Sequence, residues 1–221
     1  MMDALYLIVV VCCFIRCVRT GAAQLVPCYA VSLAYLAILE LAYDPFSPEW
    51  LAKWYPVAVG GYMLMRLLAV AEAFLLHSYG HPKRKLIASS TVMLSLVCAA
   101  IMAWTVTGGS VVLAAIQARR VITVGLFAFL LIYSLLRWSM GEWRGGFASR
   151  HLLILLAISA SLAVPSLLAV AGPKHWWGTI DAWAYGIRSL LLIAWAAYAI
   201  PGPPAVLARE QRPVSNVQSH A

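Results

Sequence analysis

The residues best placed to do chemistry are six charged residues that lie inside or at the edges of long apolar stretches. Four are arginines and two are acidic: Glu40, Arg66, Arg119, Arg120, Asp181 and Arg188. Charged side chains are costly in lipid, so they face the interior of a helical bundle and mark functional sites by default. Arginine binds a carboxylate through two parallel hydrogen bonds. The arginine surplus therefore predicts a ligand-binding pocket for a small anion or a carboxylate.

Two other interpretations of these six residues stay open. In the first, ion pairs between helices fix the helix register; Asp181 and Arg188, seven residues apart, would share a helix face. In the second, residues 111–120 lie along the membrane surface, which leaves Arg119 and Arg120 among lipid headgroups. The interpretations differ in whether the guanidinium groups meet in one shared cavity.

Glu72 lies deeper, in the inner half of the apolar stretch 56–79, and is a candidate for proton coupling. A carboxyl group in an apolar site can stay protonated and neutral, which would let it carry a proton. The alternative is a structural carboxyl group that is held by hydrogen bonds.

Motifs for catalysis and cofactor binding are absent from the sequence. There is no Walker loop, no His-Glu-x-x-His, no Gly-x-Ser-x-Gly and no paired-cysteine metal site. His77 and His151 both fall near the inner boundary of their stretches, and we expect them to be solvated rather than haem ligands. The lysines lie outside the apolar stretches, so none is available for a Schiff base. We therefore expect no enzymatic activity, no metal and no cofactor.

The composition predicts the elements that position these residues. Of 221 residues, 63% are hydrophobic and 11% are charged, whereas a soluble domain is about half apolar and a quarter charged. A spanning helix needs roughly 20 apolar residues. Seven such stretches occur, at about 4–18, 22–43, 56–79, 86–107, 111–136, 151–171 and 181–200. We predict an all-α, polytopic membrane bundle of seven transmembrane helices over residues 1–200, with Ser110 as an N-cap and a disordered tail over 201–221.

The basic residues predict the orientation of this bundle. Ten of the 16 lysines and arginines lie on one side of the membrane: Arg16, Arg19, Lys83, Arg84, Lys85, Arg137, Arg144, Arg150, Arg209 and Arg212. The opposite loops hold only Lys53 and Lys174. Loops rich in lysine and arginine stay cytoplasmic. We therefore expect the N-terminus outside, the C-terminus in the cytoplasm, and the six charged residues in the outer half of the bundle.

These features predict a function class without naming a ligand. We expect a non-enzymatic integral membrane protein of a bacterial inner (plasma) membrane, either a small receptor-like module or an accessory subunit of a larger membrane complex. Its partners would be anionic lipids of the inner leaflet and another membrane protein or a cytoplasmic protein, but no nucleic acid. The alternative is a small transporter or channel, with Glu72 as the candidate residue for proton coupling.

Overall fold

The computed structural model describes residues 2–42, 49, 53–78, 81–106, 110–141, 143, 146–171 and 177–198, without the side chains of 2–4, 102–104, 106, 169–171 and 177–182. The predicted tail, 201–221, lies outside these ranges. The regular structure of the described residues is helical, which confirms the all-α prediction. The eight helices are α1 (Met2–Arg19), α2 (Ala22–Leu25), α3 (Pro27–Ala42), α4 (Tyr55–His77), α5 (Arg84–Val106), α6 (Val111–Ser139), α7 (Phe147–Ala171) and α8 (Trp177–Tyr198).

Four of these helices are long and apolar enough to cross a membrane. They are α4, the Arg84–Ile101 part of α5, α6, and the Phe147–Leu168 part of α7. The shorter helix α3 is also apolar, with 16 residues. Four candidate spans indicate a multi-pass membrane protein, while the count of seven spans and the orientation stay predictions.

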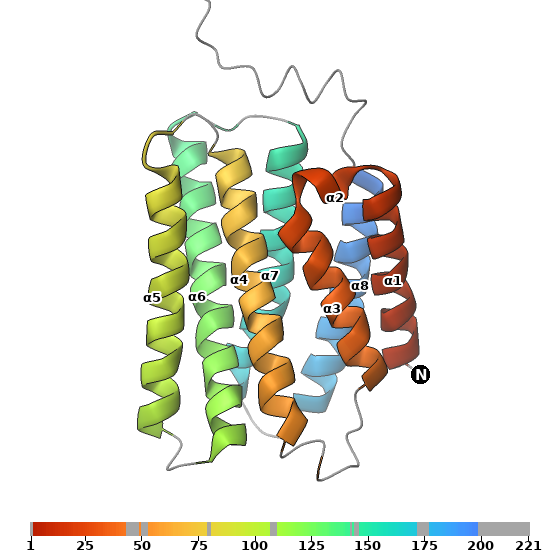
Figure 1. Ribbon diagram of the computed structural model, residues 1–221, viewed down its shortest axis with the longest axis vertical. Helices are drawn as coiled ribbons and strands as arrows, with labels where there is room; N and C mark the ends of the chain where they lie inside the picture. Colours follow the sequence, from red (N-terminus) through yellow and green to blue (C-terminus); the bar gives the residue numbers. More distant parts are fainter. Residues whose placement is uncertain are drawn as a thin grey trace, which may run out of the picture.

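Five helices pack side by side in a closed ring (Figure 1). Its close pairs are α1 with α3, α3 with α4, α4 with α7, α7 with α8, and α8 with α1. Helix α6 packs against α4 and α7, and α5 lies outermost against α4 and α6. We call the end of the bundle where α6 begins the Ser110 end and the opposite end the Gly141 end. The ring positions a site because its members approach the centre from several directions.

The start of α6 confirms the predicted N-cap. The Ser110 hydroxyl accepts a hydrogen bond from the Leu113 amide at 3.4 Å, and the Ser110 backbone is extended, with φ −79° and ψ 111°. The cap satisfies one of the four amides that a helix leaves unpaired at its N-terminus. Helix α6 therefore starts at the predicted residue, and this start fixes the position of Arg119 two turns further along.

The predicted single helix over 22–43 is broken in its first turn. Gly21 has φ +73°, a left-handed conformation that glycine adopts without strain. It joins α1 to the one-turn helix α2, and Val26 then leaves the helical region with φ −131° and ψ 62°. Pro27 starts α3, where its missing N–H costs no hydrogen bond. The interruption exposes the first amides of α3 to a partner from another helix.

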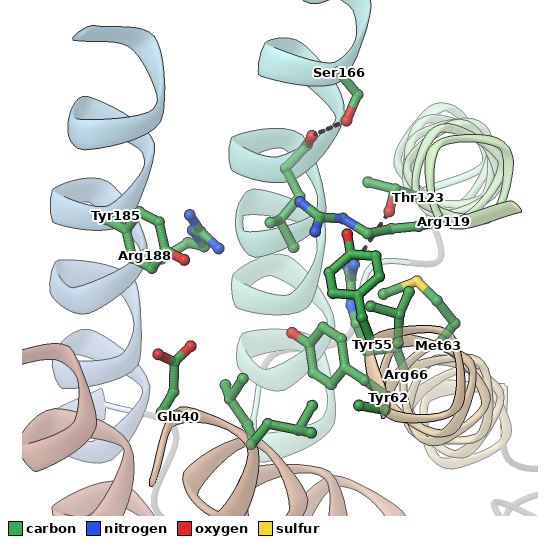
Figure 2. A pocket seen from close by; sticks show the side chains of 15 residues that line it. Glu40, Tyr55, Tyr62, Met63, Arg66, Arg119, Thr123, Ser166, Tyr185 and Arg188 are labelled. Atoms are coloured by element: carbon green, nitrogen blue, oxygen red, sulfur yellow. Dashed lines mark hydrogen bonds between the residues drawn. The ribbon is translucent and has the colours of Figure 1, made fainter. Parts of the chain in front are cut away.

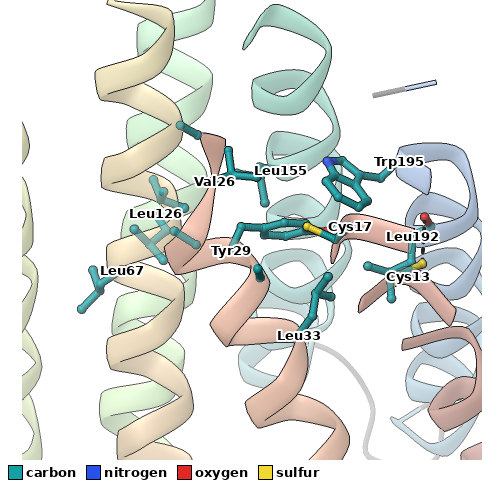
Figure 3. Close-up of a cluster of buried hydrophobic side chains, with 14 of the residues drawn as sticks. Cys13, Cys17, Val26, Tyr29, Leu33, Leu67, Leu126, Leu155, Leu192 and Trp195 are labelled. Atoms are coloured by element: carbon teal, nitrogen blue, oxygen red, sulfur yellow. Dashed lines mark hydrogen bonds between the residues drawn. The ribbon is translucent and has the colours of Figure 1, made fainter. Parts of the chain in front are cut away.

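A layer of buried side chains fills the ring toward the Gly141 end (Figure 3). The Tyr29 ring lies 4.8 Å from the Trp195 ring and 4.9 Å from the His151 ring, measured between centroids. Val26 and Leu155 pack beside them, and all five side chains are buried. Such a layer separates the centre of the ring from the Gly141 end.

Both histidines that we expected to be solvated are buried, so that expectation is wrong. His151 is fully buried, and its Nδ1 accepts a hydrogen bond from Trp195 Nε1 at 2.8 Å. His77 Nδ1 lies 2.9 Å from the Tyr133 hydroxyl. The sequence predicts where each imidazole lies along its helix. It does not reveal the aromatic side chains from other helices that surround the imidazole. Hydrogen bonding to these aromatic partners makes burial tolerable.

Replacing Gly61 with alanine should destabilise the bundle, while the same change at Gly60 should not. A Cβ at Gly61 would collide with the Tyr35 hydroxyl, which donates to the Ala58 carbonyl at 3.2 Å. A Cβ at Gly60 meets nothing within 4 Å. We expect Gly61→Ala to lower the free energy of unfolding by about 1–3 kcal/mol, the usual cost of overpacking. Gly60→Ala should be neutral or stabilising, because alanine favours helix over glycine by about 1 kcal/mol. Equal effects in detergent unfolding experiments would contradict this packing.

Candidate functional site

Four of the six predicted charged residues line one cavity in the Ser110 half of the bundle (Figure 2). They are Glu40 of α3, Arg66 of α4, Arg119 of α6 and Arg188 of α8, and α7 contributes Leu162 and Ser166. The cavity has a volume of about 230 Å³. Charged groups from four helices therefore share one space, as the pocket interpretation requires.

Arg66 is the most deeply buried of these charges. Its side chain is 7% exposed, and its guanidinium donates to the Thr123 hydroxyl at 3.5 Å and to the Ser159 hydroxyl at 3.4 Å. The Tyr62 ring centroid lies 5.8 Å from its Cζ atom. Both hydrogen bonds are at the long limit and go to neutral oxygens. A buried guanidinium held in this way keeps most of its capacity to bind an anion.

Arg188 is held against aromatic rings. Its Cζ atom lies 4.1 Å from the Tyr185 ring centroid and 5.7 Å from that of Tyr6, and its Nε donates to the Ala184 carbonyl at 3.0 Å. The two tyrosine rings meet edge to face, 5.3 Å apart. Cation–π contacts stabilise a guanidinium without neutralising its charge. Arg188 therefore adds positive charge to the cavity in a fixed orientation.

The cavity carries surplus positive charge. Three guanidinium groups line it against a single carboxylate, that of Glu40, among the described lining residues. In the part of the chain that the structure describes, no carboxylate lies within 4.0 Å of Arg66, Arg119 or Arg188. Arg66 is buried, Arg188 is half-buried and Arg119 is exposed, so the cost of unneutralised charge in a low-dielectric interior falls mainly on Arg66. Among the described lining residues the positive charge exceeds the negative charge, while the choice between an anion site and interhelical ion pairs stays a prediction.

Arg120 and Asp181, the two remaining predicted residues, are not among the described residues that line this cavity. Arg120 is half-buried but is not among the lining residues, because consecutive residues of a helix point about 100° apart. The side chain of Asp181 lies outside the described residues, so its expected contact with Arg188 stays a prediction.

Glu72 caps the N-terminus of α3 from α4. Its two carboxylate oxygens accept hydrogen bonds from the amides of Cys28 at 2.9 Å and Tyr29 at 3.0 Å. These are the second and third residues of α3, whose preceding residue, Val26, has no side-chain acceptor. A carboxylate at a helix N-terminus is further stabilised by the helix dipole. This geometry agrees with the structural alternative for Glu72, and proton coupling stays a prediction.

Removing the Glu72 carboxylate should destabilise the protein. We expect Glu72→Ala to lower the free energy of unfolding by about 2–3 kcal/mol, because two helix amides lose their acceptor. Glu72→Gln should cost about 1 kcal/mol, since the amide oxygen keeps one bond and the amide nitrogen cannot accept the other. The control is Glu49→Ala, which removes an exposed ion pair with Lys53 at 2.9 Å and should cost under about 1 kcal/mol. Chemical unfolding in detergent measures all three, and a Glu72→Ala variant as stable as the control would refute the cap.

Several tyrosines of the cavity were missed by inspection of charge alone. Tyr55 and Tyr62 share a face of α4 with Arg66, at helical positions i, i+7 and i+11, and Tyr185 precedes Arg188 by three residues on α8. This spacing is present in the sequence and could have been used. Aromatic residues placed one or two turns from an intramembrane arginine would have predicted the ring contacts.

The fold and the cavity together define a class of protein. The described helices indicate a multi-pass membrane protein with a positively charged cavity in one half of its bundle. Comparison with models of protein families, with curated proteins and with solved structures finds no match for this chain.

Proposed function

We propose that this protein is a small, non-enzymatic, receptor-like membrane module that binds a compact carboxylate or related anion in the cavity. The observation that supports the proposal is the meeting of Arg66, Arg119 and Arg188 in one space, with no carboxylate of the described residues within 4.0 Å of any of them. Guanidinium groups bind carboxylates with charge-assisted hydrogen bonds, about twice as strong as neutral ones.

The volume of the cavity and the side chains that line it limit the range of ligands that could bind. A volume of about 230 Å³ is below the roughly 300–1,000 Å³ of pockets for drug-sized ligands. The walls combine the arginines with aliphatic and aromatic side chains, among them Leu36, Val59, Met63 and Tyr62. We propose a ligand with one anionic group and a small apolar body, because each part then meets matching chemistry.

The buried layer toward the Gly141 end supports binding over transport. Tyr29, Leu155, Trp195 and His151 are each at most 6% exposed, and they fill the ring between the cavity and the Gly141 end. Transport requires a path through this layer, whereas binding does not. In our proposal the cavity opens to the outside, and occupancy is passed to a membrane or cytoplasmic partner at the Gly141 end.

Binding of benzoate to the purified protein tests this function. Benzoate has a carboxylate on a small apolar ring, and benzamide has the same shape without the charge. We expect benzoate to raise the unfolding temperature in a saturable way, because a ligand that binds the folded state stabilises it, and we expect benzamide to have no effect. Arg119→Gln should weaken the benzoate effect about tenfold, the usual loss for one charge-assisted hydrogen bond.

The matched control is Arg120→Gln, since Arg120 neighbours Arg119 on α6 but does not line the cavity. This variant should respond to benzoate as the unmodified protein does. Equal stabilisation by benzoate and benzamide, or equal losses in the two arginine variants, would overturn the proposed site.

A further inference from the structure

The carboxylate of Glu40 makes one side of the cavity chemically different from the other. Glu40 lines the cavity from α3, one helical turn after Leu36, which lines it too. Figure 2 shows Glu40 together with Arg188 on one side of the space. The other two guanidinium groups, those of Arg66 and Arg119, lie on the opposite side. The cavity therefore offers acceptor oxygens beside α3 and α8 and guanidinium donors beside α4 and α6.

The Glu40 carboxylate needs hydrogen-bond donors when a ligand fills the cavity. It is half-buried, and a carboxylate has about four acceptor positions, so its existing interaction leaves capacity for a donor from a ligand. A ligand that turned an apolar body toward Glu40 would displace water from the carboxylate without replacing the lost hydrogen bonds. Such a loss at a charged group lowers affinity about tenfold or more. A ligand with a donor group close to its own carboxylate avoids this loss.

The charge of the cavity indicates which donor group fits. An ammonium group and a hydroxyl group can both donate to Glu40. Three guanidinium groups against one carboxylate among the described lining residues leave a positive potential in the space, which repels an ammonium group. A hydroxyl group donates a hydrogen bond without adding charge. The balance of charge therefore favours a hydroxyl group.

We propose that the ligand is a hydroxycarboxylate with a small apolar body, whose hydroxyl group donates to Glu40 while its carboxylate binds the arginines. This inference rests on the proposed anion-binding function and adds Glu40 as a residue that determines specificity. The apolar body meets the wall that contains Leu36 and Val59. Three different groups of the ligand then have three different partners, and such an arrangement distinguishes the two enantiomers of a 2-hydroxy acid.

Titration of the purified full-length protein with the two enantiomers of mandelate, with phenylacetate and with phenylglycine tests the proposal. These compounds share a phenyl ring and a carboxylate, and they carry a hydroxyl group, a hydrogen atom or an ammonium group at the carbon between them. We expect one enantiomer of mandelate to bind at least about tenfold more tightly than phenylacetate and than the other enantiomer. Phenylglycine should bind more weakly than that enantiomer.

Glu40→Leu should abolish the preference for mandelate over phenylacetate and the difference between the enantiomers. Phenylacetate should bind more tightly to this variant, because the repulsion between its carboxylate and that of Glu40 is lost. The matched control is Glu49→Leu, which removes an exposed carboxylate that is not among the described lining residues and should keep both preferences.

Equal affinities for mandelate and phenylacetate in the unmodified protein would overturn the hydroxycarboxylate proposal, and so would an unchanged preference in Glu40→Leu. Phenylglycine binding more tightly than mandelate would overturn the choice of the hydroxyl group. In each of these outcomes phenylacetate still binds, so the anion site itself would stand. If none of the four compounds binds and benzoate fails as well, the proposed function is overturned together with this inference.

Discussion

Arg66→Met should remove most of the carboxylate affinity and still leave a folded protein. The methionine keeps an unbranched side chain of similar reach but loses the buried charge. We expect the benzoate affinity to fall between about tenfold and a hundredfold, because a charge-assisted hydrogen bond contributes about 1.5–3 kcal/mol. Without ligand, the free energy of unfolding should be unchanged or higher, since the guanidinium has only two long bonds to neutral hydroxyls, at 3.4 and 3.5 Å. Titration calorimetry and chemical unfolding of the same sample measure both quantities.

The same variant separates the pocket interpretation from the ion-pair interpretation. If Arg66 held helix register through an ion pair, Arg66→Met would leave an unpaired buried carboxylate and cost about 3–5 kcal/mol. A loss of that size without ligand would contradict the pocket. Arg120→Met serves as the control for removing a neighbouring positive charge outside the cavity.

Reporter fusions should give an all-or-none result along the chain. Alkaline phosphatase is active only where its disulfides form, outside the cytoplasm. We expect activity for a fusion after Ser110 and none for fusions after Lys85 or Gly141, because the loops rich in arginine and lysine stay cytoplasmic. A cytoplasmic fluorescent reporter at the same three positions should give the opposite pattern. Phosphatase activity at Lys85 would reverse the orientation and place the cavity on the cytoplasmic side.

Helix positions could be predicted from the sequence wherever local chemistry determines them. The stretch 56–79 corresponds to α4 at Tyr55–His77, and Ser110 starts α6 as a cap. The break at Val26 was missed, although the residue before a proline is disfavoured in the helical region and Pro27 is a typical helix start. What satisfies the first amides of α3 is Glu72, which is 44 residues from Cys28 in the sequence. Pairing at such separation depends on tertiary packing, which local patterns do not contain.

The depth of the site residues along their helices could be predicted from the sequence. The direction in which each side chain points from its helix could not. Counting turns from the helix starts placed Arg66, Arg119 and Arg188 at similar depths, and the structure brings them to one cavity. The choice between Arg119 and Arg120 depends on how α6 is rotated against α4 and α7. Rotation is determined by side-chain packing between helices, and the even distribution of apolar residues around a membrane helix carries little information about it.

If α3 crosses the membrane, the Glu72 cap on its N-terminus also constrains the order in which the helices of this chain are inserted. Helix α3 leaves the ribosome before α4, so its first amides have no acceptor from Glu72 until 44 more residues have been made. An unpaired amide is unfavourable in the hydrocarbon interior but not at the lipid–water boundary. The start of α3 must therefore stay near the boundary, or within the translocon, until α4 emerges beside it. Biogenesis would then proceed by joint release of α3 and α4 as a hairpin rather than by independent insertion of each helix.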